Sequence, residues 1–265
     1  MLGAVIGDIA GSRYEHQNIK TKEFPFFSVF SRMTDDSILT LAVAKALLSA
    51  RADGSDLGRC TVSRMQQLGR RYPDCGFGGH FYQWIFLEDP QPYGSWGNGA
   101  AMRVSACGWV GQSLPQVKQL AKAVTEVSHN HKEGLKGAEA IAAAVFLART
   151  GSTKEEIRDF IQDHYYDLHF SLDGIRDSYG FDVSCQGSVP QAIEAFLESS
   201  DFEDTVRNAI SIGGDSDTIA AMAGSIGEAF YGIPGSLRAE ALTYFEDDLL
   251  QILLEFEERY PPKIL

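Results

Sequence analysis

The chain has 265 residues, enough for one large domain or two small ones, and 44% of them are hydrophobic, which excludes a disordered protein. Its 36 Asp and Glu residues outnumber its 23 Lys and Arg residues, so the formal net charge is −13. We do not expect so acidic a chain to bind nucleic acid or anionic membrane surfaces nonspecifically. A local pocket for an anionic small molecule is still compatible with this charge.

The beginning of the chain and its cysteines favour a cytoplasmic protein without a membrane span. Residues 1–8 include no basic residue and reach Asp8 after a short apolar run, unlike a secretory signal. No apolar run approaches the ~20 residues that a membrane-spanning helix needs. The four cysteines show neither a CxxC pair nor metal-ligand spacing, and a chain of this length does not need disulfides. For the oligomeric state, we favour a monomer.

The elements predicted along the chain are almost all helices. Gly3, Gly7 and Gly11 recur every four residues, which on a helix forms a smooth ridge for close packing. Residues 23–30 are rich in aromatic residues and give a weak strand signal, which a proline interrupts. After Ser37, an i, i+3, i+4 apolar pattern predicts a helix. The same periodicity returns in nine later segments: 59–71, 115–128, 134–149, 153–164, 190–199, 203–212, 218–230, 236–243 and 246–260.

Several of these segments begin with residues that favour the start of a helix. Thr153 precedes a lysine and two glutamates, and Asp201 precedes the segment 203–212. Pro115 and Pro190 stand where a first-turn proline is expected. These signals support the helical assignment and place the helix boundaries.

The predicted fold is all-α. Segments 134–147 and 219–230 are so rich in small and apolar residues that we expect them at the centre of a bundle. No strands alternate with the helices, and no linker or internal repeat interrupts them. We therefore predict a single compact multi-helix domain over residues 1–265.

Two oxygen-rich segments stand at predicted helix starts. Residues 34–37 (Thr-Asp-Asp-Ser) precede one helix, and residues 215–218 (Asp-Ser-Asp-Thr) precede another about 180 residues later. Each segment offers two carboxylates and hydroxyl groups, which are the oxygen ligands that hard cations such as Mg²⁺ prefer. If the two segments face each other, they could hold two metal ions with bridging oxygens, as in metal-assisted hydrolases.

The alternative interpretation is that these residues only cap their helices. Asp, Ser and Thr are preferred N-caps, and acidic residues near a helix start oppose its dipole. A cap uses one side-chain oxygen, however, whereas both segments supply several in succession beside very apolar helices. Gly213 and Gly214 also allow a sharp bend before the second segment. Together the two segments favour a metal site, and the ligand type leaves Ca²⁺ and Mn²⁺ open beside Mg²⁺.

Further candidate residues lie in three other segments. Asp8, within the glycine ridge, and Glu15, just after it, are hard to explain by packing, so we predict a supporting role for Asp8 and acid/base chemistry for Glu15. The glycine-rich loop 93–103 could hold a phosphate on its backbone N–H groups, with an aromatic residue stacked on a base or sugar, although a simple turn explains it more readily on its own. His129 and His131 lack a third zinc ligand nearby, which favours a polar pocket lining over a zinc site.

In their order and spacing, these segments resemble the ADP-ribosylglycohydrolase family of the dinitrogenase-reductase-activating type. The resemblance covers nearly the whole chain and rests on GAVIGDIAGSRYE, MTDDS, GNGAAMR, SHNHKEG, CQGSVPQAIEAF and GGDSDTIAAMAGSIGEAFYG. It implies an all-α fold with a cleft that binds two Mg²⁺ ions, or Mn²⁺ in their place. It also implies a hydrolase that releases ADP-ribose from a modified arginine or serine side chain or from another ADP-ribosyl conjugate.

The resemblance further assigns roles to individual residues. Glu15 matches a mobile glutamate that acts in the branch of the family cleaving serine-linked ADP-ribose, and our hypothesis is that Glu15 or Asp36 assists the attacking water or the leaving group. One departure is Lys132, which follows His131 where the family usually has proline. The implied metal ligands are Thr34, Asp35, Asp36, Asp215, Asp217 and Thr218; the implied diphosphate loop is Gly94, Ser95, Trp96, Gly97, Asn98 and Gly99, with His129 on the nucleotide side.

Two other functions stay open on the sequence alone. A two-metal phosphoester or diphosphate hydrolase would use the same oxygen ligands but would release AMP or phosphate instead of ADP-ribose. A non-catalytic ADP-ribose-binding protein is disfavoured, because this chain keeps both oxygen-rich segments.

Overall fold

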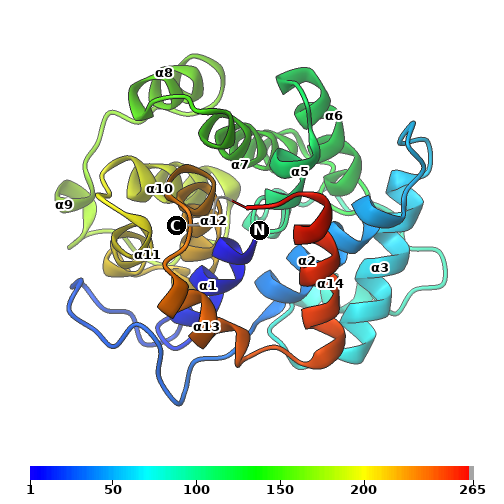
Figure 1. Ribbon diagram of the computed structural model, residues 1–265, viewed down its shortest axis with the longest axis horizontal. Helices are drawn as coiled ribbons and strands as arrows, with labels where there is room; N and C mark the ends of the chain where they lie inside the picture. Colours follow the sequence, from blue (N-terminus) through cyan, green and yellow to red (C-terminus); the bar gives the residue numbers. More distant parts are fainter. Residues whose placement is uncertain (263–265) are drawn as a thin grey trace.

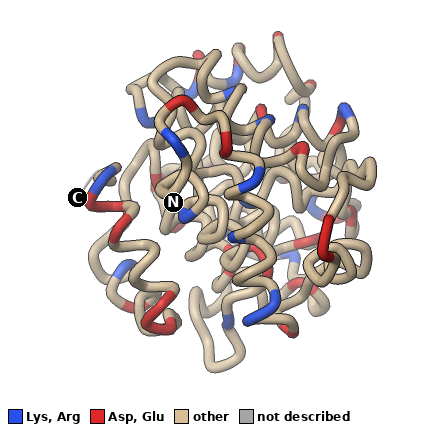
Figure 2. Tube along the Cα trace, turned by 90° about the vertical axis from the view of Figure 1, so that its right-hand side faces the viewer, with Lys and Arg blue, Asp and Glu red and all other residues tan. Residues whose placement is uncertain are grey.

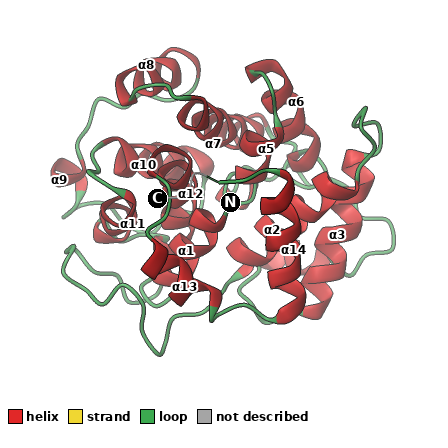
Figure 3. Ribbon diagram, viewed as in Figure 1, coloured by secondary structure: helices red, strands yellow, loops and turns green. Residues whose placement is uncertain are grey.

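The computed structural model describes residues 1–262. This part of the chain consists of helices joined by loops, which confirms the predicted all-α class (Figure 3). An isolated antiparallel bridge joins Gly97 to Ser184. Residues 23–30 form a loop, since Pro25 has no N–H group to offer a neighbouring strand. Residues 263–265, the last three of the predicted domain, lie outside the described residues.

The described residues form α-helices of 4 to 19 residues and one short 3-10 helix, joined by loops. The helices are α1 (Leu2–Gly11), α2 (Asp35–Ser49), α3 (Leu57–Arg71), α4 (Gly79–Trp84), η1 (Asn98–Ala100), α5 (Ser105–Val110), α6 (Leu114–Thr125), α7 (Lys132–Thr150), α8 (Lys154–His164), α9 (Leu172–Ile175), α10 (Cys185–Leu197), α11 (Phe202–Ser211), α12 (Ser216–Tyr231), α13 (Gly235–Leu242) and α14 (Asp247–Arg259).

Every helical segment that the periodicity predicts is present, and the largest difference lies at the start of α10. Pro190 sits inside this helix rather than in its first turn. The helix begins five residues earlier because the Ser184 hydroxyl accepts a hydrogen bond from the Gly187 N–H (3.0 Å) and caps it. The short helices α4, α5 and α9 were not predicted, since four to six residues are too few to show a helical period.

The predicted helix caps are found at α8, α11 and α6. Thr153 and Glu156 form a capping box at α8, and the Asp201 side chain accepts from the Asp204 N–H (2.8 Å) at α11. Pro115 lies in the first turn of α6. These local rules therefore fix several helix starts independently of the core.

Helices α1 and α12 lie side by side in the middle of the molecule (Figure 1). The glycine ridge of α1 makes this close approach possible: a Cβ at Gly7 would overlap the backbone of Ala220, and one at Gly11 would overlap the backbone of Asp217. All ten residues of α1 are buried, and α12 also packs on α7, α10 and α11. The predicted central position of α7 and α12 is confirmed.

The charged residues surround this core. Figure 2 shows acidic and basic residues interspersed along the helices and loops. Within residues 1–262, none of the helices combines the length and the apolar character that crossing a bilayer requires. Among the charged residues that are buried, several acidic ones gather where α1, α2 and α12 meet.

Candidate active site

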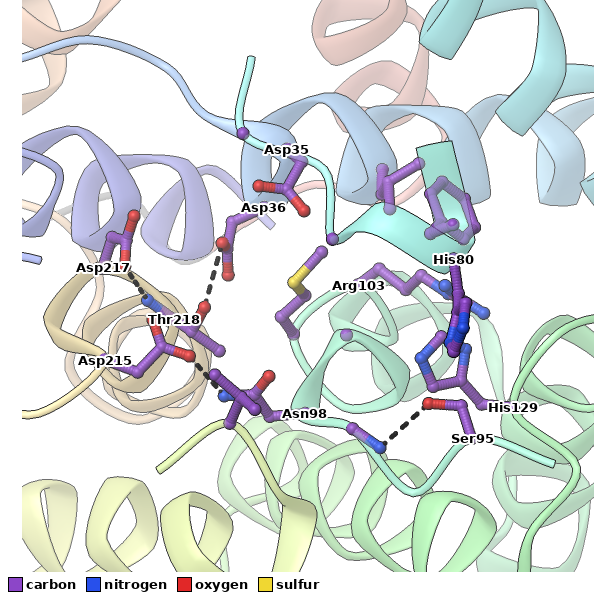
Figure 4. A pocket seen from close by; sticks show the side chains of 18 of the residues that line it. Asp35, Asp36, His80, Ser95, Asn98, Arg103, His129, Asp215, Asp217 and Thr218 are labelled. Carbon is purple, nitrogen blue, oxygen red and sulfur yellow. Dashed lines mark hydrogen bonds between the residues drawn. The ribbon is translucent and has the colours of Figure 1, made fainter. Parts of the chain in front are cut away.

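The fold brings the two oxygen-rich segments together at the N-terminal ends of α2 and α12. Asp35 and Asp36 begin α2, and Asp217 and Thr218 lie in the first turn of α12. The two segments touch directly, because the Thr218 hydroxyl donates to Asp36 Oδ2 (3.1 Å) across 182 residues of sequence (Figure 4). The expected face-to-face arrangement is therefore present.

Helix capping accounts for only one of these side chains. The Thr34 hydroxyl caps α2 by accepting a long hydrogen bond from the Asp36 N–H (3.4 Å). Asp215 stands at the N-cap position of α12 but makes no capping bond; its Oδ2 accepts from the Asn98 side-chain amide instead (2.6 Å). Gly213 and Gly214 have φ values of +68° and +77°, which produce the expected sharp bend before Asp215. The carboxylates are thus directed away from the helix ends and toward a common space.

Asp8 of α1 supports the start of α2. Its carboxylate accepts from the backbone N–H (2.9 Å) and hydroxyl (2.7 Å) of Thr34. It also accepts from the backbone N–H (3.1 Å) and hydroxyl of Ser37. Four hydrogen bonds to one fully buried carboxylate fix Thr34 and Ser37 relative to α1.

The acidic residues form two groups that share Asp217. Ligand oxygens of Asp8, Asp36 and Asp217 lie within 4.8 Å of one another, and so do those of Glu15, Asp215 and Asp217. Within residues 1–262, no Lys or Arg side chain pairs with any of these acids, and the buried Asp36 Oδ1 has no hydrogen-bond partner. Such concentrated negative charge away from water requires a cation or bound protons.

Burial raises the pKa of every acid in these groups, and mutual repulsion adds to the shift for several of them. Burial is the main cause for Asp8, whose pKa rises to about 6 despite its four hydrogen bonds. Burial and then the charge of Asp8 raise the pKa of Asp35 to about 7. Burial followed by neighbouring carboxylates also raises the pKa of Asp36 and Asp217 well above the usual range of an aspartate. Each shift expresses the cost of keeping these groups ionised together without a counter-charge.

Glu15 reaches the same space from the loop after α1. The side chain of Asn18 holds this loop against the bend before α12: its amide donates to the carbonyls of Glu15 (3.0 Å) and Gly214 (2.8 Å) and accepts from the Gly214 N–H (2.8 Å). Burial raises the pKa of Glu15, with His16 opposing the shift and Asp215 adding to it. One amide side chain therefore sets the position of Glu15 relative to Asp215.

The glycine-rich loop forms the facing wall of the cavity. It is anchored on both sides, by the Gly94 N–H to Asn130 Oδ1 (2.8 Å) and by the Asn98 N–H to the Val183 carbonyl (2.8 Å). The Gly97 N–H donates to the Ser95 hydroxyl (3.1 Å), so three of the N–H groups expected to face a phosphate already donate within the protein.

Both walls enclose one cavity of about 420 Å³. Of the predicted site residues, Thr34 lies behind the cavity against Asp8, Gly94 lies at the anchored end of the loop, and the Trp96 side chain is 53% exposed. The other predicted residues line the cavity: Glu15, Asp35, Asp36, Ser95, Gly97, Asn98, Gly99, His129, Asp215, Asp217 and Thr218.

Comparison with known proteins identifies the family. A family model described as ADP-ribosylglycohydrolase matches residues 1–262. The chain belongs to the ADP-ribosylglycohydrolase family. It is 26% identical to ADP-ribosylhydrolase ARH3 of Homo sapiens over 331 aligned positions that include 94% of this chain and 90% of that protein. It is also 26% identical to ADP-ribosylarginine hydrolase Tri1 of Pseudomonas putida, over 89% of this chain and 70% of the relative.

A solved structure named ADP-ribosylglycohydrolase-related protein complex has the same fold, with a TM-score of 0.71 and 22% identity over 97% of this chain and 95% of that one. As a member of this family, the chain is a glycohydrolase that acts on ADP-ribose conjugates. The acidic groups at α1, α2 and α12 are the part of this glycohydrolase that could hold metal ions.

The cavity of this ADP-ribosylglycohydrolase also contains residues that the sequence reasoning missed. Arg103 is fully buried although the sequence places it only at the end of the glycine-rich loop. His80 lies on the six-residue helix α4, and Phe181 and Val183 lie on the irregular segment between α9 and α10. Neither region has a periodic pattern from which its position could be inferred.

Lys132, the departure from the family pattern, occupies the first position of α7. Proline suits this position because its φ angle is already helical and its missing N–H has no intrahelical partner. Lysine fits equally well, since His131 caps the helix through Nδ1, which accepts from the Glu133 N–H (3.2 Å). The helix therefore starts directly after His131 without the proline.

Proposed function

We propose that this glycohydrolase depends on Mg²⁺ and cleaves the glycosidic bond between ADP-ribose and a modified arginine or serine side chain. The observation that carries the proposal is the pair of acidic groups at the starts of α2 and α12, which have no Lys or Arg partner within residues 1–262. Names of relatives support an ADP-ribosyl group as the sugar part of the substrate, and one of them is called an ADP-ribosylarginine hydrolase. The serine alternative rests on the position of Glu15 after the glycine ridge.

The donor set fits hard divalent cations. Asp36 Oδ1 is a buried carboxylate oxygen without a partner, and its neighbours are all oxygen donors. Thr34 donates its hydroxyl proton to Asp8, which leaves a lone pair of its oxygen available. We assign two Mg²⁺ ions, replaceable by Mn²⁺, to the residues named from the family resemblance: Thr34, Asp35, Asp36, Asp215, Asp217 and Thr218.

The chain itself would supply orientation and proton transfer. Bound Mg²⁺ would polarise the oxygen of a water molecule or of a substrate hydroxyl group. Glu15 is partly buried beside Asp215, and its raised pKa suits a group that gives or takes a proton at the scissile bond. Asp36, at the contact between the two helix starts, is the second candidate for this role. The glycine loop and His129 would bind the ADP part on the opposite wall.

We also infer that the enzyme works as a monomer in the cytoplasm. All four cysteines are free thiols, which suits a reducing compartment. Cell fractionation with an antibody against the native enzyme tests the compartment, and light scattering of the purified protein tests the oligomeric state.

A product-release assay tests the proposed reaction. Peptides carrying arginine- or serine-linked ADP-ribose are incubated with the purified enzyme and Mg²⁺, Mn²⁺ or EDTA, and the products are identified by mass spectrometry. We expect free ADP-ribose with Mg²⁺ and none with EDTA, and the preferred peptide identifies the linkage. Release of AMP or phosphate would show that the enzyme cleaves a phosphate bond and not the glycosidic bond. Equal release of ADP-ribose in EDTA would show that the reaction does not need a metal ion.

A further inference from the structure

A chain of hydrogen-bonded side chains lies behind the glycine loop and begins at Arg103. This side chain is fully buried, and its Nη2 donates to the Ser128 hydroxyl oxygen (2.8 Å). Its guanidinium carbon lies 5.8 Å from the centre of the Phe81 ring. An arginine has five N–H donors and no acceptor, so Ser128 Oγ must accept in this bond.

The direction of the next hydrogen bond follows from the first. Ser128 Oγ lies 2.9 Å from Nδ1 of His129, and both residues are buried. If Nδ1 carried a proton and donated it, the Ser128 hydroxyl proton would be left without an acceptor among the described residues. Because an unpaired buried donor is costly, the hydroxyl donates to a bare Nδ1. A neutral imidazole that is bare at Nδ1 carries its proton on Nε2.

The resulting Nε2–H of His129 points at the glycine loop. A Cβ at Gly99 would lie 3.4 Å from Nε2 and a Cβ at Gly97 would lie 3.7 Å from it, so the missing side chains leave the space in front of this atom open. Among residues 1–262, Nε2 has no hydrogen-bond partner, and His129 lines the cavity. The donor is therefore available to a bound molecule.

The surroundings of His129 keep the ring neutral. Burial and then the positive charge of Arg103 lower the pKa of His129 well below its usual range. The other titratable groups around it are Tyr93, whose ring centre lies 5.5 Å away, and His80, whose ring centre lies 5.9 Å from that of Tyr93. Neither of them supplies the negative charge that would stabilise an imidazolium.

We propose that Arg103 and Ser128 are positioning residues that hold His129 as a neutral Nε2–H donor for an acceptor oxygen of the ADP moiety on the glycine loop. The identity of this ligand rests on the proposed function, whereas the tautomer follows from the protein alone. Neutral recognition makes the affinity for the diphosphate or ribose oxygen independent of pH over the range where a free histidine titrates.

Nitrogen NMR tests the tautomer directly. The enzyme is labelled with ¹⁵N-histidine, and the His129 signals are assigned by their loss in His129→Gln. We expect the chemical shift of an unprotonated Nδ1 and of a protonated Nε2 from pH 8 to pH 5.5. A protonated Nδ1, or a doubly protonated ring within this range, would overturn the proposal. This readout requires neither turnover nor a ligand.

Ligand binding tests the positioning role. ADP is the probe, since it lacks the second ribose and so avoids the acidic groups, and calorimetry gives its affinity. We expect Ser128→Ala to weaken ADP binding about tenfold. The variant Ser128→Thr keeps the hydroxyl group and should therefore keep the wild-type ADP affinity and NMR signature. Equal ADP affinity in wild type and a folded Ser128→Ala would overturn the positioning role. Absence of ADP and ADP-ribose binding in the wild type would instead overturn the proposed function, and NMR would still decide the tautomer.

Discussion

The two walls of the cavity differ in the charge that they leave uncompensated. The wall built by α1, α2 and α12 buries several carboxylates that have no Lys or Arg partner within residues 1–262. The opposite wall buries Arg103, whose Nε and Nη1 have no hydrogen-bond partner among the described residues, together with a neutral histidine. The acidic wall therefore favours a cation or bound protons, and the opposite wall carries no competing negative charge.

This difference explains how one acidic protein can bind a negatively charged nucleotide. The net charge of −13 disfavours anions in general, and the acidic wall would repel a diphosphate. The glycine-loop wall contains no carboxylate among its lining residues, so the diphosphate is expected there and the metal-bound sugar on the acidic wall. Four predictions test this division.

Removing the acid shared by both groups should have the largest effect. Asp217→Asn is expected to lower kcat/KM by about a hundredfold to a thousandfold, since it weakens both acidic groups. The same change should raise the melting temperature of the metal-free enzyme, because it removes one buried charge from a mutually repelling cluster. Steady-state kinetics and calorimetry measure the two effects, with the exposed Asp163→Asn on α8 as the control. Full activity in Asp217→Asn would show that the acidic wall takes no part in the reaction.

Loosening the loop that carries Glu15 should have a moderate effect. Asn18→Ala removes the hydrogen bonds that tie Glu15 to Gly214, and we expect kcat to fall roughly tenfold through mispositioning of Glu15, with little change in KM. The control is Gln17→Ala, an exposed neighbour in the same loop. Equal losses in both variants would indicate a general effect of the loop and would contradict a specific role for Asn18.

A methyl group added to the glycine-loop wall should weaken ADP binding without changing the affinity for Mg²⁺. Gly99→Ala places a Cβ 3.4 Å from His129 Nε2, where the ligand oxygen is expected, so ADP affinity should fall about tenfold. Mg²⁺ affinity, measured by calorimetry, should stay unchanged because the acidic wall is untouched. Gly235→Ala, at an open position on α13, is the control. A loss of Mg²⁺ affinity in Gly99→Ala would contradict the division into two walls.

The last prediction concerns the pH dependence of stability in the metal-free enzyme. Asp8 and Asp35 have pKa values of about 6 and about 7 in the folded state against 3.8 ordinarily, so between pH 4 and 7 the native protein binds more protons than the unfolded chain. The stability of the metal-free enzyme must therefore fall as pH rises through this window. We expect the melting temperature of the metal-free enzyme to decrease across this window, and differential scanning calorimetry at several pH values measures the decrease. Asp35→Asn should flatten this slope, and an unchanged slope would contradict the contribution of Asp35.

The residues of the acidic wall could be predicted from the sequence, whereas several residues of the opposite wall could not. Asp36 and Asp217 lie at helix starts, which local sequence patterns predict without knowledge of the tertiary fold. The segments that contain them also supply more side-chain oxygens than helix capping uses. Arg103 and His80 enter the cavity only through packing between distant helices, and a single basic residue gives no local sign of burial. The contribution of Asp8 to the acidic groups was likewise predicted only as support, since the convergence of α1 with α2 is a tertiary feature.

The glycine ridge of α1 also bears on the order of events during synthesis. The Gly3 N–H donates to the buried Glu228 carboxylate (2.8 Å), a partner 225 residues later in the chain. At about 5–20 residues per second, the first helix leaves the ribosome roughly 10–45 s before α12 exists. A helix of ten residues without its packing partner is not stable in water. In refolding experiments, α1 and α12 should therefore gain protection from hydrogen exchange in the same step, and the acidic wall cannot form before that step.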